Sequence, residues 1–173
     1  SGNIAGGNGG GIYRSSASGE HMTLVHSTVS GNNGANGGGI YFIPSAGGLL
    51  SIENSIVAGN TTGGTGADIE QVVALTVNAS GANLIGDNSS VETIFPAGPL
   101  AGTLAAPLDP KLAPLGRYGG STPTMALLAG SPAVNAAIVT ANSPALDQRG
   151  VARPGGAQND LGGMYANGRG VRR

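Results

Sequence analysis

Residues 1–13 read SGNIAGGNGGGIY, and residues 30–41 read SGNNGANGGGIY. The Ser-Gly-Asn triplet recurs at an offset of 29 residues, and the Gly-Ile-Tyr triplet recurs at an offset of 28. A degraded third copy starts with AGN at residues 58–60 and ends with ADI at residues 67–69. Self-similarity with a period of this length is the signature of stacked structural repeats. The sequence therefore predicts a solenoid.

Short strands are expected between the glycine-rich turns. Residues 23–29 (TLVHSTV) superpose on residues 51–57 (SIENSIV) at an offset of 28, and in both segments apolar residues partly alternate with polar ones. Such alternation is typical of a half-buried strand. No window shows the sustained apolar stripe of an amphipathic helix. Glycine and asparagine then mark corners, where the backbone needs a positive φ or a close approach.

A unit of about 28 residues with a few short strands cannot bury its own apolar face, so successive units must stack. Stacking in register pairs each strand in parallel with the strand of the next coil, about 4.8 Å away. This predicts an all-β fold, a single-stranded parallel β-helix of roughly six coils. Ile12, Ile40 and Ile69 would form an interior ladder, and Asn32 would stack on Asn60.

Regular pairing is expected to loosen in the second half of the chain. Prolines cluster after residue 95, and proline cannot donate a hydrogen bond to a strand ladder. Residues 147–165 are loop-like and richer in charge. We therefore assign residues 1–108 to β-helix coils, and residues 109–173 to Pro/Gly-rich terminal coils and a loop-rich C-terminal cap of the same domain.

Composition excludes several classes of function. The chain of 173 residues has a formal net charge of −1, one lysine and no cysteine. Nucleic-acid binding requires clustered basic residues, so nucleic acid is not an expected partner. No apolar run approaches the ~20 residues that span a bilayer, so we expect no membrane span.

Four motifs in the second half resemble the C-terminal part of bacterial choice-of-anchor Q proteins, which are similar to polymorphic outer-membrane and other surface β-helix proteins. The motifs are GGSTPT at 119–124, AGSPA at 129–133, DQRG at 147–150 and NDLG at 159–162, and the SGN…GGGIY copies resemble the same proteins. Asn135 stands where the family usually has Asp. The resemblance implies a right-handed β-helix on a secreted or surface-anchored bacterial protein.

One turn fits a calcium-binding pattern. Residues 63–68 (GGTGAD) match the first six positions of the nonapeptide GGxGxDxUx. Turn carbonyls and the Asp68 carboxylate would supply the hard oxygen ligands that calcium takes. However, Glu70 occupies the position expected to be apolar, and the first two copies have glycine instead of Asp68. A plain turn is the alternative, and no other cofactor is expected.

The remaining polar residues predict no active site. Hydrolysis of a glycosidic bond needs two carboxylates roughly 5–9.5 Å apart. No two acidic residues share a face at the repeat offset, so we expect solvated surface charges. His21 and His26 lie five residues apart, which does not place them on one strand face, and a surface or corner position is expected for both. The charges of Asp147, Arg149, Arg153 and Asp160 are expected to form Arg–carboxylate bridges in the C-terminal cap; an anion site is the alternative.

These patterns predict a non-catalytic extracellular or cell-surface β-helix with a structural or adhesive function. The first coil, which opens within a repeat, would expose unpaired strand edges, and exposed edges recruit further strands. We therefore expect homo-oligomers or head-to-tail filaments through this coil. The alternative is a polysaccharide-binding or polysaccharide-degrading β-helix, although four Tyr, two Phe and no Trp offer few aromatic platforms for glycans.

Overall fold

The structure is a computed structural model that describes residues 1–15, 20–43, 48–72, 76–153 and 158–163. All regular secondary structure in these ranges is β, as predicted. The strands are β1 (Ile12–Ser15), β2 (His21–Val25), β3 (Thr28–Val29), β4 (Asn33–Gly34), β5 (Ile40–Ile43), β6 (Leu49–Glu53), β7 (Ile56–Val57), β8 (Thr61–Thr62), β9 (Ile69–Gln71), β10 (Thr76–Ser80) and β11 (Leu84–Ile85).

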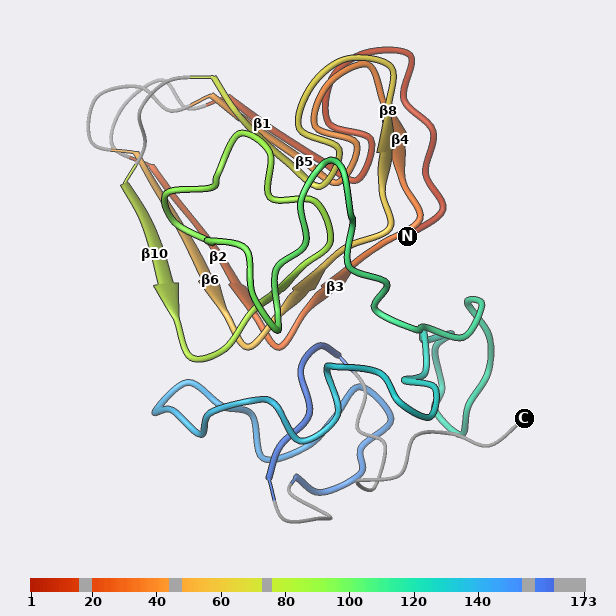
Figure 1. The fold of residues 1–173 in the computed structure, drawn as a ribbon. Coiled ribbons are helices and arrows are strands. Elements are labelled where there is room, and N and C mark those ends of the chain that lie inside the picture. Colours follow the sequence, from red (N-terminus) through yellow and green to blue (C-terminus); the bar gives the residue numbers. More distant parts are fainter. Residues whose placement is uncertain (16–19, 44–47, 73–75, 154–157, 164–173) are drawn as a thin grey trace.

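The strands stack in parallel at the repeat spacing, which confirms the solenoid prediction for the N-terminal half. The ladders are β1-β5-β9, β2-β6-β10, β3-β7-β11 and β4-β8. Ile12 pairs with Ile40, and Ile40 pairs with Ile69, as the sequence predicts. We call residues 4–29 coil 1, residues 33–57 coil 2 and residues 61–85 coil 3. Figure 1 shows the three coils superposed along the solenoid axis.

The prediction of roughly six coils is wrong for the described residues, because no ladder contains more than three strands. After β11 the described chain forms one further β-bridge to the coils, the isolated bridge between Ala101 of the proline-rich region and Ile85. Residues 91–95 then turn over coil 3, and Val91 and Phe95 join its buried interior. In Figure 1 this green segment crosses the end of the solenoid.

Apolar side chains fill the inside of the coils. Ile40, Phe42, Leu50, Ile52 and Ile69 are at most 1% exposed and belong to one cluster. Burying each such side chain contributes roughly 1.5–3 kcal/mol. At the coil 1 end, Ile12, Met22 and Leu24 pack on this cluster and are only partly buried.

A left-handed residue interrupts each predicted strand of residues 23–29 and 51–57. The φ angle is +43° at His26 and +49° at Asn54, and at the same corner of coil 3 it is +64° at Gly81. Asparagine and histidine tolerate this region better than most residues. The strand therefore turns sharply here, and β2 and β3 belong to different ladders.

The second half of the chain lies beside the solenoid. We call residues 127–153 and 158–163 the flank segment. Its Leu127, Ala133 and Leu161 pack on Ile56 and Leu84, which point outward from β7 and β11. This contact explains why both residues of β7 are buried, since Val57 faces the interior. In Figure 1 the flank segment, cyan to blue, lies against the β3 side of the coils.

The flank segment accounts for most of the loop-rich C-terminal region that the sequence predicts. Its described contacts are with the corners and outer face of the coils, whereas residues 91–95 cover coil 3. The division of the chain at residue 108 stays a prediction, and residues 154–157 and 164–173 of the predicted cap lie outside the described residues.

Candidate functional site

Asp68, the predicted calcium ligand, is buried at the end of a hydrogen-bonded ladder. It is 1% exposed. Its Oδ1 accepts hydrogen bonds from the backbone N–H of Asn60 (3.1 Å) and from Asn60 Nδ2 (2.7 Å). Its Oδ2 accepts one from the backbone N–H of Asp87 at 2.6 Å. Three N–H donors therefore point at the carboxylate from inside the protein.

The ladder that ends at Asp68 is formed by the asparagine that directly precedes each of the three coils. Asn3 Nδ2 donates to Asn32 Oδ1 (2.9 Å), and Asn32 Nδ2 donates to Asn60 Oδ1 (2.9 Å). Backbone N–H groups of Asn3 and Asn32 donate to the same two oxygens. The predicted stacking of Asn32 on Asn60 is confirmed. Asp68 supplies the acceptor that the next coil would otherwise supply, so its carboxylate completes the ladder.

Burial raises the pKa of Asp68 to about 6, although the hydrogen bonds from Asn60 and Asp87 act in the opposite direction. The neighbouring charge of Asp87 raises it further. In the described residues, no group of three or more His, Cys, Asp or Glu side chains could hold a metal ion. The calcium site stays a prediction. In the structure the Asp68 carboxylate has a structural role, since it completes the asparagine ladder.

A groove of about 530 Å³ lies beside the ladder end. Polar groups of Thr61, Asp87 and Asp109 line it together with Leu104 and Pro107. Asp87 is 3% exposed, and its Oδ1 accepts a hydrogen bond from the backbone N–H of Ser89 at 3.0 Å. The proline-rich segment after coil 3 thus brings Asp109 to the same groove as Asp87, a proximity without a repeat signal in the sequence.

The expectation that the acidic residues are solvated surface charges is wrong for five of them. They are at most 6% exposed because the flank segment or a neighbouring coil covers them: Glu53, Asp68, Asp87, Asp147 and Asp160. Glu53 accepts hydrogen bonds from Thr140 Oγ1 and from Asn142 Nδ2. The bonds from Thr140 and Asn142 lower the pKa of the Glu53 carboxyl.

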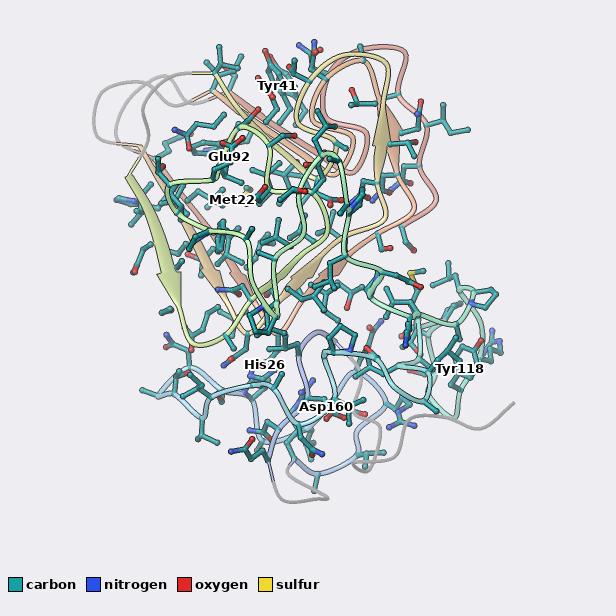
Figure 2. The ribbon with its side chains drawn as sticks, in the orientation of Figure 1. Met22, His26, Tyr41, Glu92, Tyr118 and Asp160 are labelled. Atoms are coloured by element: carbon teal, nitrogen blue, oxygen red, sulfur yellow. The ribbon has the colours of Figure 1, made fainter. Side chains whose placement is uncertain are left out.

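His26 occupies the corner of coil 1 and is 4% exposed. The prediction of a corner position is confirmed, but both ring nitrogens have partners in the flank segment. Arg153 Nη1 lies 3.1 Å from Nδ1, and Ser143 Oγ lies 3.3 Å from Nε2. In Figure 2 His26 points from the corner toward the loop segment that carries Asp160. Burial, followed by the charge of Arg153, lowers the pKa of His26 to about 4.

These contacts determine the tautomer of His26. A guanidinium group only donates hydrogen bonds, so Nδ1 must accept and therefore carries no proton. The proton of the neutral ring is then on Nε2, which donates to Ser143 Oγ. A serine nucleophile needs the reverse arrangement, with an unprotonated Nε2 accepting from the hydroxyl and a carboxylate oriented on Nδ1–H. Ser143 and His26 are therefore not arranged as a nucleophile and its base.

The predicted charge cluster of the C-terminal region is confirmed for one pair. Arg149 Nε and Nη2 donate to Asp147 Oδ2 at 2.9 and 2.8 Å. Arg153 instead extends to the solenoid: besides facing His26, it donates to the carbonyl oxygens of Asp160 (3.2 Å) and Gly162 (2.9 Å). The sequence offered no signal for the Arg153–His26 contact, which joins residues 127 positions apart.

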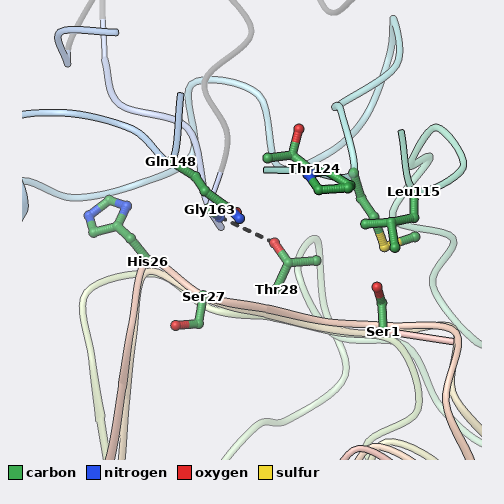
Figure 3. Close-up of a pocket in the computed structure, with 10 residues that line it drawn as sticks. Ser1, His26, Ser27, Thr28, Leu115, Thr124, Gln148 and Gly163 are labelled. Carbon is green, nitrogen blue, oxygen red and sulfur yellow. Dashed lines mark hydrogen bonds between the residues drawn. The ribbon is translucent and has the colours of Figure 1, made fainter. Parts of the chain in front are cut away.

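A second cavity, of about 340 Å³, lies between coil 1 and the flank segment. His26, Ser27 and Thr28 line it from the solenoid, and Gln148 and Gly163 line it from the other side (Figure 3). The backbone N–H of Gly163 donates to Thr28 Oγ1 across its edge at 3.2 Å. Leu115 and Thr124, which precede the flank segment, also line the cavity, so it lies where the second half of the chain meets coil 1.

Comparison of the chain with protein families, with curated proteins and with solved structures finds no match. Within the described residues, no helix has the length and apolar character needed to cross a membrane. The case for a function therefore rests on the geometry above.

Proposed function

We propose that this chain is a non-catalytic structural or adhesive β-helix of an extracellular or bacterial cell-surface protein. The motifs in its second half support membership of the choice-of-anchor Q group. A right-handed coil is the expected hand, because parallel strands joined by a crossover are almost always connected that way.

The observation that carries the proposal is that the side chains with strongly shifted pKa values are buried and make hydrogen bonds within the fold. The pKa of His26 is lowered to about 4 and that of Asp68 is raised to about 6, and both side chains make hydrogen bonds inside the protein. A general acid or base must reach a substrate proton within about 3 Å. Side chains that are 4% and 1% exposed and bonded in this way hold coils and flank segment together instead.

Assembly is proposed through the edges of the ladders. β1, β2 and β3 are the outer strands at one end of the solenoid, and β9 and β10 are outer strands at the other. Coil 1 also presents the partly buried Ile12 and Leu24. Head-to-tail stacking of copies would pair these edges and cover the apolar end of coil 1, whereas residues 91–95 already cover the interior at the coil 3 end. Such stacking is a heterologous contact that propagates into filaments.

Thr23 offers a test of this assembly. Leu49 N–H donates to Glu20 O, and His26 N–H donates to Glu53 O, so alternate residues of β2 face β6. Thr23 then directs its backbone N–H to the open edge, since backbone groups of successive strand residues face opposite sides. Thr23→Pro removes that donor, whereas Thr23→Val keeps it and serves as the matched control.

We expect sedimentation velocity to show concentration-dependent association of the unaltered chain and of Thr23→Val, and weaker association of Thr23→Pro. A chain that sediments as a monomer at every concentration overturns the assembly proposal. Screens against acidic and neutral polysaccharides test the non-catalytic proposal separately: turnover that a single acid substitution abolishes would overturn it.

The second candidate function is polysaccharide binding or degradation, and the 530 Å³ groove favours it. The exposed carboxylate of Asp109 would accept hydrogen bonds from sugar hydroxyls, and the exposed Leu104 would contact a sugar face. We expect this candidate to gain support only if an oligosaccharide binds in calorimetry and Asp109→Asn weakens its binding at least tenfold. The exposed Glu20, on β2's side of the solenoid, provides the control Glu20→Gln.

A further inference from the structure

The flank segment is held to the corner of coils 1 and 2 by a small set of polar contacts. Asn54 Nδ2 donates to Ile138 O at 2.7 Å, and Asn54 Oδ1 accepts from Ile138 N–H at 3.1 Å. Gly162 N–H donates to Asn54 O at 2.9 Å. On coil 1 the corresponding contacts are those of His26 with Arg153 and Ser143. The Asn54 contacts contain no titratable group, and Glu53, which accepts from Thr140 and Asn142, has its pKa lowered by those bonds. The coil 1 contacts depend on a histidine.

Protonation of His26 removes its contact with Arg153. The contact at 3.1 Å requires a lone pair on Nδ1, because the guanidinium group can only donate. A proton on Nδ1 places two donors and two positive charges face to face. Ser143 Oγ can still accept from Nε2–H, so it does not compensate for this change.

The other charged groups around the corner do not remove the conflict. Glu53 attracts the imidazolium from β6 but is occupied by Thr140 and Asn142. Asp160 faces the ring through its backbone carbonyl, and Asp147 and Arg149 act on Arg153 rather than on the ring. Of the charged neighbours, Arg153 has the largest effect on the pKa of His26, and that effect is downward.

We propose that His26 is an acid-sensitive latch, and that its protonation releases the flank segment from the corner of the solenoid. Release uncovers the outward face of β7 and β11, where Ile56 and Leu84 are completely buried when the latch is closed. A face of this kind, apolar and on a sheet, is a surface for association. The latch thus couples acidification to exposure of an apolar strip that is otherwise covered.

The size of the change in latch opening, and the pH range over which it occurs, follow from the titration of His26. The pKa is about 4 with the latch closed and 6.5, the ordinary value, with the ring free in solvent. A lowered pKa stabilises the closed state fully above pH 6.5, and this contribution is lost as pH falls through about 4. The ratio of open to closed molecules then rises by up to about 300-fold.

The test is hydrogen exchange of flank amides measured as a function of pH. Gly162 N–H donates to Asn54 O, and Ile138 N–H donates to Asn54 Oδ1, so both amides bond across the contact between the flank segment and the solenoid and report its closure. After correction for intrinsic exchange, we expect their protection factors to fall by one to two orders of magnitude between pH 6.5 and 4. Amides of Ile12 and Leu49, which donate to Gly39 O and Glu20 O between neighbouring coils and neither to Asp68 nor to the flank segment, serve as the internal reference.

His26→Asn is the diagnostic variant, because asparagine already occupies the same left-handed corner at Asn54. It removes the titratable group without changing the backbone requirement, and we expect a fall in protection of less than tenfold. His21→Asn, a substitution of the exposed histidine in β2, is the matched control and should behave like the unaltered chain.

Two results would overturn the latch. One is a fall in flank protection in His26→Asn that equals that of the unaltered chain. The other comes from the unaltered chain alone: an NMR titration in which the His26 ring gains its proton while protection of the Ile138 and Gly162 amides stays constant. The second measurement decides the question even if His26→Asn does not fold.

Discussion

Asn54 joins two coils and the flank segment through one completely buried side chain, so its removal is the sharpest test of the fold described above. Its Oδ1 accepts hydrogen bonds from Ala82 N–H and Ile138 N–H, both at 3.1 Å, and its Nδ2 donates to Ile138 O at 2.7 Å. Its φ of +49° also makes the position unfavourable for most residues other than glycine, asparagine, aspartate and histidine.

Two substitutions separate these contributions. Asn54→Gly accepts the backbone conformation and loses the three hydrogen bonds, at about 1 kcal/mol each, so we expect a loss of roughly 3–4 kcal/mol in the free energy of unfolding once the flexibility of glycine is included. Asn54→Ala adds the left-handed conformation of a residue with a Cβ atom, which costs about 1 kcal/mol more. Asn33→Ala removes one exposed hydrogen bond, to Thr61 Oγ1, and should cost less than about 1 kcal/mol.

Urea unfolding followed by circular dichroism and by tyrosine fluorescence measures all three variants, and coincident transitions establish two-state behaviour. If Asn54→Ala lies within about 1 kcal/mol of the unaltered chain, Asn54 does not join the flank segment to the coils. If Asn54→Ala is as stable as Asn54→Gly, the argument from the left-handed corner is wrong.

Three further predictions concern the same corner and the ladder. Gly81→Ala should destabilise by roughly 2–4 kcal/mol, because a Cβ would lie 2.6 Å from Asn54 Oδ1 at a φ of +64°; in an Asn54→Gly background, measured by the same urea unfolding, the cost should fall to about 1 kcal/mol, and an unchanged cost would contradict the contact. Asp68→Asn should remove a pH dependence: the raised pKa, about 6 against an ordinary 3.8, stabilises the fold below pH 3.8 and this contribution is lost as pH rises through 6. The difference in unfolding free energy between the unaltered chain and Asp68→Asn should therefore fall by roughly 2 kcal/mol from pH 4 to pH 6.5, and a constant difference would show that Asp68 titrates normally. Asn32→Leu should destabilise by about 2–4 kcal/mol in urea unfolding, since it breaks the ladder between Asn3 and Asn60, and a loss below 1 kcal/mol would mean that the ladder is not what aligns the coils.

The repeat predicted the coils because the relevant contacts are themselves periodic. Ile12, Ile40 and Ile69 meet in one ladder, and Asn32 meets Asn60, since residues one coil apart lie directly above one another. The sequence predicted the corner at His26 and Asn54 only in part. His26 and Asn54 share a repeat position, but a polar residue in an alternating segment also fits a continuous strand.

The number of coils and the environment of the acidic residues escaped the sequence pattern. Residues 91–95 turn back over coil 3, where prolines and an irregular chain replace the repeat, and no periodicity predicts which side chains such a segment buries. The burial of Asp147 and Asp160 likewise depends on a loop-rich segment whose contacts follow no regular spacing.

What the sequence by itself determined is therefore the one-dimensional part of this protein: parallel strands, the coil length near 28 residues, the interior isoleucines and the asparagine ladder. Each depends on a neighbour one coil away, and translation along the axis repeats every contact. Only the tertiary structure decided which corner the flank segment covers, which nitrogen of His26 carries the proton, and that Asp68 ends the ladder. The first two depend on contacts between residues 84 and 127 positions apart in the chain. The third depends on a carboxylate that accepts the hydrogen bonds a further coil would otherwise accept. None of the three produces a repeat in the sequence.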